Sequence, residues 1–396
     1  MRRTAGREPS ASSSLKKNKE RVLGIYVHLP FCPYLCPYCD FAKWPLRRSA
    51  AAQYLQALDA EIERESAADA GTIFLGGGTP NTYDATDIAG LIARLRERFG
   101  ANGTLREVTI EANPELVTPA DAIAYRAAGI DRISLGVQSF NETEIRVLGR
   151  KHTPEQIAAA VSAARSAGIR SVSLDLIFAV PGQTLETWST SLEAAIALDV
   201  DHISTYGLTV EEGTPYADWQ AREPRAFFDQ DREAELYAAA IALLEAAGYE
   251  QYEISNFARP GHRSAHNENY WANGEYIGLG VGAASYRKGV RSVHTRSLDA
   301  YVEASRSGGP IPGESEQLEG DKRAGEAIML ALRTAQGVDL SGFKDRYGID
   351  VLERYAPVVE TYTSAGMLVA EDGFVRLTRR GRFVANDVCG AFVTFE

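Results

Sequence analysis

The sequence predicts an α/β protein whose larger part is a partial (β/α)6 barrel and whose C-terminal part is a winged-helix-like α+β domain. Between residues 22 and 248, six short apolar runs alternate with longer segments in which apolar residues recur every three or four positions. From about residue 313 the order changes to helices, a short hairpin and a final helix. Alternating strands and helices indicate a parallel sheet, and successive right-handed crossovers would curl it into a TIM-like partial barrel. An open doubly wound sheet fits the same alternation.

Each barrel strand is expected at one of the apolar runs, with helices between them in segments such as AAQYLQALDAEIERE and PEQIAAAVSAARSAG. The expected strands are RVLGIYVH (21–28), TIFLG (72–76), EVTIEA (107–112), RISLGV (132–137), SVSLDLIF (171–178) and HISTYGL (202–208). Residues 249–312 are rich in Tyr, Asn and Gly, so we expect loops and a hairpin that turns at Lys288 and Gly289.

The C-terminal domain is expected over residues 313–396. Its helices are predicted in DKRAGEAIMLALR and VLERYAPVVETYTSAG, and its hairpin is MLVAEDGFVRLT, with a turn at Glu371, Asp372 and Gly373. Winged domains often bind DNA, and the nearby arginines 376, 379, 380 and 382 fit that use. A formal net charge of −11 over 396 residues argues against a nucleic-acid partner.

Composition is that of a soluble globular protein, with 45% hydrophobic and 24% charged residues. No apolar run approaches the length of a membrane span. Residues 1–21 are basic and Ser-rich and lack the apolar core of a secretory signal, so we expect a disordered tail, with a transit peptide as the competing interpretation. The chain has four cysteines, too few for a disulfide scaffold, which fits a reducing compartment and a cytoplasmic location.

Three of the cysteines, Cys32, Cys36 and Cys39, stand in one C-x3-C-x2-C loop after the first strand, whereas Cys389 lies far away. Three thiolates in a short loop fit an iron–sulfur cluster, and a cube of four irons would keep one iron without a protein ligand. Structural zinc is the alternative, but it needs a fourth ligand, and only His28 is nearby.

Polar and glycine-rich motifs follow the other strands. They are GGGTP (76–80), Glu111 in EANP, GVQSF (136–140), Asp175 in LDLIF and TYGLTVEEGTP (205–215). Because the C-terminal ends of barrel strands form the active-site face, we expect these motifs to line one cavity. Each is weak by itself, since consecutive glycines also make tight turns and a proline also ends a strand.

The cysteine spacing, with Tyr38 before the last cysteine, resembles the signature of radical S-adenosylmethionine (SAM) enzymes. This resemblance implies a 4Fe-4S cluster whose open iron chelates the amino and carboxylate groups of SAM. It also implies a reductant such as ferredoxin or flavodoxin, because one electron breaks the S–C5′ bond of SAM to give a 5′-deoxyadenosyl radical. Such chemistry needs an enclosed cavity.

Within that superfamily, the chain resembles the coproporphyrinogen-oxidase-like group over about residues 22–388. The motifs are YVHLPFCPYLCPYCDF, FLGGGTPN, IEANPE, ISLGVQSFN, LGRKHT, LDLIFAVPGQT and HNENYW. The oxygen-independent coproporphyrinogen III dehydrogenases carry a further cysteine where this chain has Phe41, and a longer stretch before the cluster. The heme chaperone branch has C-x3-C-x2-C-D-F and H-N-x-x-Y-W, and both occur here.

The resemblance therefore implies a heme chaperone that binds a 4Fe-4S cluster, SAM and heme and passes heme to acceptor heme proteins. A homodimer is one option for its oligomeric state, which the sequence leaves open. The alternative is an oxygen-independent coproporphyrinogen III oxidase (dehydrogenase) in porphyrin biosynthesis, so whether the chain is an enzyme stays open. A nucleic-acid-modifying radical protein is a third interpretation, based on the C-terminal domain alone.

The resemblance assigns three kinds of site residue and no catalytic residue. The cluster ligands are Cys32, Cys36 and Cys39. SAM would contact Tyr26, Tyr38, Gly77, Gly78, Thr79, Glu111, Gln138, Arg150 and Asp175. The glycines would allow close approach of the backbone, Glu111 and Asp175 would accept bonds from the ribose, and Tyr38 would pack on adenine. A structural ion pair between Arg150 and Asp175 is the alternative for those two residues.

The HNENYW motif adds a heme contact. His266 would be an axial ligand of the heme iron, and Tyr270 and Trp271 would offer flat surfaces to the porphyrin. The alternative is a hydrogen-bonded structural histidine. Residues 259–275 are expected to form a mobile loop that allows heme release.

Overall fold

The computed structural model describes residues 22–100 and 103–393. The expected tail, residues 1–21, lies outside the described residues. Within the described part, no helix is both long enough and apolar enough to cross a membrane.

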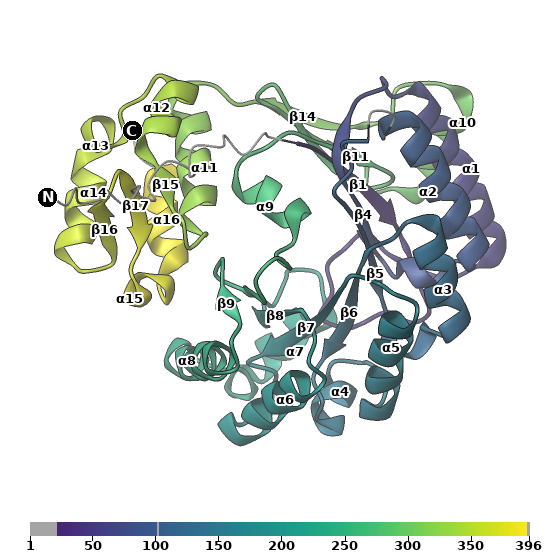
Figure 1. Ribbon diagram of the computed structural model, residues 1–396, viewed down its shortest axis with the longest axis horizontal. Coiled ribbons are helices and arrows are strands. Elements are labelled where there is room, and N and C mark those ends of the chain that lie inside the picture. Colours follow the sequence, from purple (N-terminus) through teal and green to yellow (C-terminus); the bar gives the residue numbers. More distant parts are fainter. Residues whose placement is uncertain (1–21, 101–102, 394–396) are drawn as a thin grey trace, which may run out of the picture.

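The six expected strands all form, and they lie parallel and in chain order. They are β1 (Leu23–Leu29), β4 (Ala70–Gly77), β5 (Glu107–Ala112), β6 (Arg132–Gln138), β7 (Ser171–Phe178) and β8 (His202–Gly207). The main helices between these strands are α1 (Arg48–Arg64), α2 (Ala85–Phe99), α3 (Pro119–Ala128), α5 (Pro154–Ser166) and α6 (Leu185–Ala197), and α8 (Gln230–Ala246) follows β8. Figure 1 shows α1, α2, α3, α5 and α6 along the outer side of a curved sheet. The prediction of a partial barrel is confirmed, and the open doubly wound sheet is not formed.

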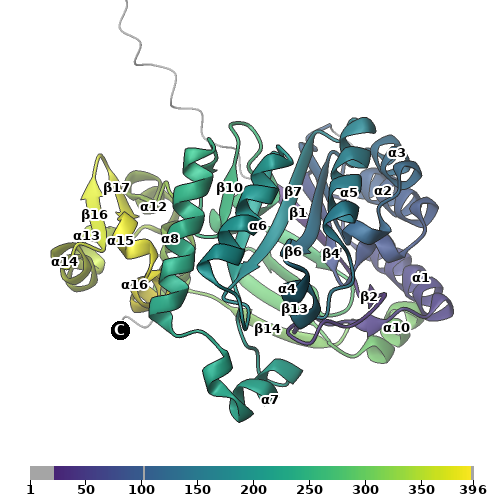
Figure 2. The same ribbon diagram turned by 90° about the horizontal axis from the view of Figure 1, so that it is seen from below.

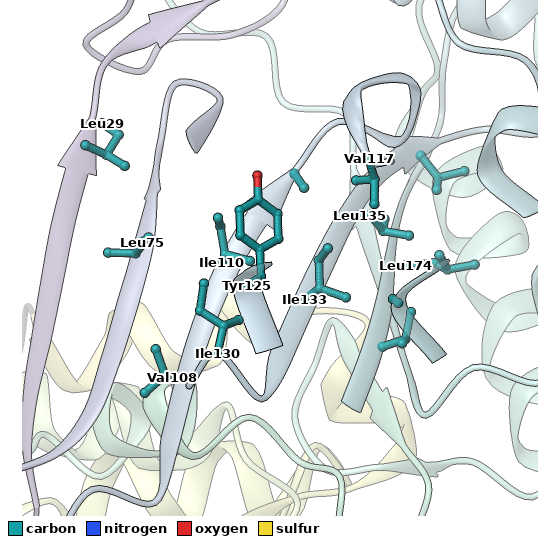
Figure 3. Close-up of a cluster of buried hydrophobic side chains, with 14 of the residues drawn as sticks. Leu29, Leu75, Val108, Ile110, Val117, Tyr125, Ile130, Ile133, Leu135 and Leu174 are labelled. Carbon is teal, nitrogen blue, oxygen red and sulfur yellow. The ribbon is translucent and has the colours of Figure 1, made fainter. Parts of the chain in front are cut away.

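Buried aliphatic side chains between the sheet and the outer helices fix the strand register. Leu75 lies opposite Ile110, and Ile110 lies opposite Ile133, so the three side chains form a row across β4, β5 and β6. Figure 3 shows this row and the Tyr125 ring of α3 beside it. Full burial of each such side chain contributes roughly 1.5–3 kcal/mol. The row therefore places the carboxyl ends of the three strands side by side, and the polar motifs follow directly after these ends.

The sheet extends beyond the six predicted strands, to twelve in the described part of the chain. On one side, β11 (Tyr276–Leu279) pairs in parallel with β1, followed by β12 (Ala284–Arg287), β13 (Val290–His294) and β14 (Gly313–Gln317). On the other side lie β10 (Asn256–Ala258) and β9 (Glu250–Gln251). The predicted turn between β12 and β13 is confirmed, because Lys288 and Gly289 both have positive φ, 51° and 85°.

Residues 249–312 contain more regular structure than the sequence predicted. The HNENYW motif forms helix α9 (Ala265–Trp271), and a further helix, α10 (Leu298–Ser307), packs on α1. The remaining short elements of the barrel are β2 (Phe31–Cys32), β3 (Trp44–Pro45), α4 (Glu142–Val147), α7 (Pro215–Arg222) and the 3-10 turns Pro80–Thr82, Pro114–Leu116 and Pro224–Ala226. The expected mobile loop over residues 259–275 is therefore wrong for residues 265–271, which are helical.

The C-terminal part has its own apolar core, which includes Ile328, Leu332, Phe343, Val375 and Val388. Its helices are α11 (Gly320–Leu332), α12 (Leu340–Tyr347), α13 (Val351–Arg354), α14 (Ala356–Ser364), α15 (Arg379–Arg382) and α16 (Ala385–Val393). Its strands are β15 (Val338–Asp339), β16 (Leu368–Glu371) and β17 (Phe374–Leu377). The hairpin turn is one residue shorter than predicted, because Glu371 pairs with Phe374 and leaves only residues 372–373 in the turn. Figures 1 and 2 show this part beside the barrel, away from the outer helices.

Candidate functional site

The cysteine loop, residues 32–39, begins at the end of β2 and is held by its own backbone. The chain returns as β3, where Trp44 lies opposite Phe31, and the Leu46 N–H donates to the carbonyl oxygen of Cys32 at 2.9 Å. The Cys39 N–H donates to the carbonyl oxygen of Cys36 at 3.3 Å. All three thiols are free; Cys32 is buried and the other two are half-buried. The loop therefore presents three sulfur ligands from a closed backbone frame.

Polar groups surround these thiols. The Thr79 side chain hydrogen-bonds to Cys32, and Nη1 of Arg150 lies 3.8 Å from the sulfur of Cys36. Burial raises the pKa of the Cys32 thiol to about 11 and also raises the pKa of Cys39. No group of three or more His, Cys, Asp or Glu side chains among the described residues is arranged to hold a single metal ion. Ligands of different irons in one cluster do not have to meet at one point, so the thiol donor set fits a cluster.

His28 has both ring nitrogens engaged, which removes the fourth ligand considered for zinc. Nε2 lies 2.7 Å from the carbonyl oxygen of Ala42, and Nδ1 lies 2.9 Å from the hydroxyl of Tyr26. A carbonyl oxygen only accepts, so Nε2 carries the proton and Nδ1 accepts from Tyr26. Burial lowers the pKa of His28, which favours this neutral form. His28 thus links the barrel interior to the segment that follows Cys39.

The GGGTP turn is bound to the segment that leads into the cysteine loop. The N–H of Gly78 donates to the carbonyl oxygen of Leu29 at 2.9 Å, and the N–H of Thr79 donates to that of Phe31 at 3.0 Å. A Cβ atom on Gly78 would lie 2.6 Å from the carbonyl carbon of Pro30. Gly77 has a φ of +105°, and a Cβ there would meet the His28 ring at 2.5 Å. Neighbouring protein atoms therefore already require both glycines, as in the tight-turn alternative, whereas the resemblance explained them by close approach of the backbone to SAM.

Two carboxylates lie inside the barrel at the ends of β5 and β7. Glu111 accepts from the N–H of Gly77 at 3.2 Å, and Asp175 accepts from the hydroxyl of Ser134 at 2.9 and 3.1 Å. Burial, together with the charge of Asp175, raises the pKa of Glu111 to about 7, and burial raises the pKa of Asp175. These carboxylates are held by neutral donors and repel each other, which suits a ligand that brings hydroxyl or cationic donors.

Gln138 and Arg150 supply polar atoms without protein partners. Gln138 has a φ of 58°, and the strand register shifts between Gly136 and Gln138. Its buried Oε1 has no hydrogen-bond partner among the described residues, and neither has Nε of Arg150. Leaving such an atom unsatisfied costs about 1–3 kcal/mol, so both point to a polar ligand. The site therefore fits SAM, which carries an amino group and a carboxylate.

The alternative of an Arg150–Asp175 ion pair is not what the structure contains. Nη2 of Arg150 donates to Oδ1 of Asn113 at 2.8 Å and to the carbonyl oxygen of Gly136 at 2.6 Å, and Nη1 contacts the Cys36 sulfur. Asp175 is bonded to Ser134 instead. Arg150 thus places its positive charge beside the cysteine loop.

The two tyrosines predicted to contact SAM occupy different surroundings. The Tyr26 ring stacks on Phe74, with centroids 6.2 Å apart, and faces the barrel interior. The Tyr38 ring meets Tyr216 edge-on at 6.1 Å, within a small apolar cluster that includes Leu148. Tyr38 is thereby held at the rim beside Cys36, where its packing partner in this structure is a protein side chain.

His266 is buried and fully hydrogen-bonded, with only 1% of its surface exposed. Nδ1 lies 2.8 Å from the Thr72 hydroxyl, Nε2 lies 2.9 Å from the Tyr270 hydroxyl, and the ring stacks on Phe74 at 5.1 Å. Burial lowers its pKa to about 3. The expectation that His266 offers a free nitrogen to heme iron is not met in this structure, which has the hydrogen-bonded histidine that was the alternative.

A cavity of about 490 Å³ opens beside the cysteine loop, and we call it the Tyr26 cavity. Its walls come from β1, the segment after Cys39, α9, the β12–β13 hairpin and α11. The lining side chains include Tyr26, Phe41, Tyr270, Tyr276, Tyr286, Arg291, Arg296, Met329 and Leu330. Three of these residues were singled out from the sequence: Tyr26 as a SAM contact, Phe41 as the position that distinguishes the two branches, and Tyr270 as a surface for the porphyrin. The others come from segments that carried no motif. For Tyr276 and Tyr286 the aromatic content of residues 270–286 was the only signal, and Arg291, Arg296, Met329 and Leu330 had none. Trp271 instead lines a separate cavity of about 420 Å³, between α9 and the C-terminal part.

Comparison with known proteins decides the family. Residues 26–195 match the model of the radical SAM superfamily, and residues 318–384 match that of the HemN C-terminal domain. The chain is 33% identical to the heme chaperone HemW of Bacillus subtilis, over 93% of this chain and 98% of the relative. The chain belongs to the HemW family of radical SAM proteins. The HemW of Escherichia coli is 32% identical, over 94% of this chain and 98% of that protein.

The fold has a solved counterpart in the same superfamily. Coproporphyrinogen III oxidase (HemN) from E. coli, described as a radical SAM enzyme, superimposes with a TM-score of 0.82 at 25% identity, covering 95% of this chain and 91% of that one. Membership of the radical SAM superfamily implies a 4Fe-4S cluster and SAM. The predictions of family and cofactor class are therefore confirmed, while the individual ligand residues remain proposals.

Proposed function

We propose that this protein is a heme chaperone that holds heme in the Tyr26 cavity and passes it to acceptor heme proteins. Its relatives over nearly their full length are named heme chaperones. The observation that carries the proposal is Phe41, whose side chain is 62% exposed and lines the cavity two residues after Cys39. The coproporphyrinogen III dehydrogenases that the chain resembles have a cysteine at this position.

The cavity wall suits a flat apolar ligand. Phe41 stands on one side, and Tyr276, Tyr286, Met329 and Leu330 stand on the others. An exposed phenyl group beside a cavity gains roughly 1.5–3 kcal/mol when a ligand covers it. Aromatic rings and methionine also make favourable contacts with a conjugated ring system. These residues therefore support binding of a porphyrin face.

The cavity also carries cationic groups that suit the two propionates of heme. Arg296 pairs with Asp40 at 3.1 Å, with side chains 60% and 47% exposed, and Arg291 pairs with Glu316 and Glu326 at 3.2 and 3.0 Å. Exposed ion pairs contribute only about 0–1 kcal/mol, so a propionate can replace Asp40 or Glu316 at little cost, whereas the side chain of Glu326 is only 14% exposed and would stay paired with Arg291. The arginines would then orient the heme with its carboxylates at the rim.

The chain's own residues would hold the cofactors as follows. Cys32, Cys36 and Cys39 would ligate the cluster, and Arg150 would balance negative charge beside Cys36. Gln138, with its unpartnered oxygen, and the carboxylates of Glu111 and Asp175 would receive the polar groups of SAM. Gly77 ends β4, with Gly78 and Thr79 directly after it, whereas Tyr26 lies within β1 and Tyr38 in the cysteine loop; all five would contact SAM in this proposal. When bound, the cluster and SAM supply one-electron chemistry, for which a ferredoxin or flavodoxin would be the electron donor.

Three further points complete the proposal. Three free thiols that must ligate iron suit a reducing compartment such as the cytoplasm. The acceptor is a heme-free heme protein, and a homodimer is one arrangement for the chaperone. The second candidate function, oxidative decarboxylation of coproporphyrinogen III, is favoured by the likeness to HemN, but Phe41 stands where those enzymes have a cysteine.

Titration with ferric heme tests the proposal. We expect the full chain to bind heme and Phe41→Asp to weaken binding at least about tenfold, since each 1.4 kcal/mol is a factor of ten. The matched control is Ile123→Asp, because Ile123 is 61% exposed on α3 and does not line the cavity. Absence of heme binding by the unmodified protein, or equal effects of the two substitutions, would contradict the proposal.

A further inference from the structure

We infer that Tyr270, and not His266, supplies the atom that binds the heme iron, and that His266 is a positioning residue for the Tyr270 hydroxyl. This inference rests on the proposed function, because it names the iron ligand within the same cavity.

The surroundings of His266 argue against direct ligation. Its ring is enclosed between Phe74 and the backbone of β1, where a Cβ on Gly24 would lie 3.2 Å from the ring. Both nitrogens are bonded, to Thr72 and Tyr270. The backbone around it is also tied down, since the N–H groups of Ala265 and His266 both donate to the Glu107 carboxylate at 3.1 Å. To reach a heme, His266 would have to break both side-chain bonds and leave a packed site.

Tyr270 lies one helical turn further along α9 and is the residue of that pair that lines the Tyr26 cavity. Residues four apart lie on the same face of a helix, which brings Nε2 of His266 within 2.9 Å of the Tyr270 hydroxyl. The Tyr270 ring meets Tyr276 edge-on at 4.6 Å, which fixes its orientation. Tyr270 therefore lies in the cavity wall, and its hydroxyl is fixed by a hydrogen bond to the buried His266.

A tyrosine oxygen is an established protein ligand of heme iron. With ferric heme, the O–Fe bond forms as the phenol O–H bond breaks, the proton passes to water, and no electron is transferred. A deprotonated tyrosine oxygen can only accept, so Nε2 of His266 would carry the proton and restrain that oxygen, while Nδ1 would accept from the Thr72 hydroxyl. The residues of the cavity already described would contact the porphyrin faces and the propionates of heme. Tyr270 would add the contact to the iron.

The other tyrosines of the cavity are less suited. The Tyr26 hydroxyl donates to His28, and it lies among the residues proposed for SAM. Tyr286 is buried, and its hydroxyl accepts from Nε of Arg323 at 3.3 Å. Tyr276 is half-buried beside Tyr270 in the same cavity, so it provides the matched control.

The test uses the full chain loaded with ferric heme and studied by absorption and resonance Raman spectroscopy. We expect phenolate–iron vibrations in the unmodified protein and in Tyr276→Phe, and their loss in Tyr270→Phe together with at least a tenfold weaker heme affinity. Tyr270→His should replace the phenolate signature with that of a nitrogen ligand. His266→Gln should keep the phenolate vibrations but shift their frequency, because the restraining bond changes.

The outcomes separate the two proposals. If the unmodified protein binds no heme, the proposed function fails. If it binds heme with a nitrogen ligand that His266→Ala removes and added imidazole restores, while Tyr270→Phe keeps the spectrum, this inference fails and the proposed function stands. Iron and circular dichroism measurements on each variant confirm that the compared proteins are equally folded.

Discussion

Replacement of Glu111 by glutamine tests the electrostatics of the barrel interior in the absence of any ligand. The pKa of Glu111 is raised from its usual 4.5 to about 7, chiefly by burial and then by Asp175. Between these values the unfolded chain loses the proton before the folded one, so ionisation of Glu111 lowers stability as pH rises from 4.5 to 7 and adds nothing further above 7. The glutamine of the Glu111→Gln variant cannot ionise, yet its carbonyl can still accept from the Gly77 N–H. At 1.36 kcal/mol per pKa unit, the variant should gain about 2.5 kcal/mol on the unmodified protein between pH 5 and pH 8.

Thermal unfolding of both proteins, free of cluster and SAM, measures this gain. With an unfolding entropy of about 2 cal/mol/K per residue, 2.5 kcal/mol in a chain of this length corresponds to a Tm difference that grows by about 3 °C between pH 5 and pH 8. The control is Glu193→Gln, which makes the same exchange at an exposed position in the middle of α6 and should not reproduce this growth. Parallel Tm curves for Glu111→Gln and the unmodified protein would refute the reasoning about a buried, repelled carboxylate.

Three further predictions address the cofactor sites. The protein reconstituted without oxygen should hold about four irons per chain. The variants Cys32→Ala, Cys36→Ala and Cys39→Ala should each lose this iron, whereas Cys389→Ala should keep it, because Cys389 is buried in the C-terminal core. Stoichiometric zinc without iron–sulfur absorbance would contradict the prediction of a cluster. Gln138→Ala should keep or raise the Tm, because it removes a buried oxygen whose lack of a partner costs about 1–3 kcal/mol. The same variant should bind SAM about tenfold more weakly. Unchanged SAM affinity would argue against a contact between Gln138 and SAM. Gly78→Val should lose iron as well as SAM binding, because its side chain would clash with the Pro30 backbone that leads into the cysteine loop. Full iron content with loss of SAM binding alone would contradict this, since it would show that the clash does not disturb the cysteine loop.

The barrel was predictable because its strands carry a local signal. Each of the six is a short apolar run bounded by turn residues, and the row through Leu75, Ile110 and Ile133 needs only that pattern to form. Strand β11 was missed because YIGL is short and surrounded by glycines, and it is stabilised by parallel pairing with β1, about 250 residues earlier in the chain. Pairing over such a distance leaves no periodicity in the sequence.

Part of the candidate site was predictable from the sequence and part was not. The motifs at the strand ends meet because parallel strands present their carboxyl ends together, so Gly77, Glu111 and Cys32 could be grouped in advance. The direction in which a side chain points from a short helix could not be predicted. His266 and Tyr270 share one face of α9, and only the packing of that face on Phe74 determines which of them is enclosed and which reaches the cavity.

The most direct test of the account offers two substrates to one preparation, reconstituted without oxygen and supplied with SAM and a reductant. Heme binding is followed by absorption, and decarboxylation of coproporphyrinogen III by product analysis. The account predicts about one heme per chain and no decarboxylation at a catalytic rate. Efficient decarboxylation coupled to SAM cleavage, without heme binding, would contradict it.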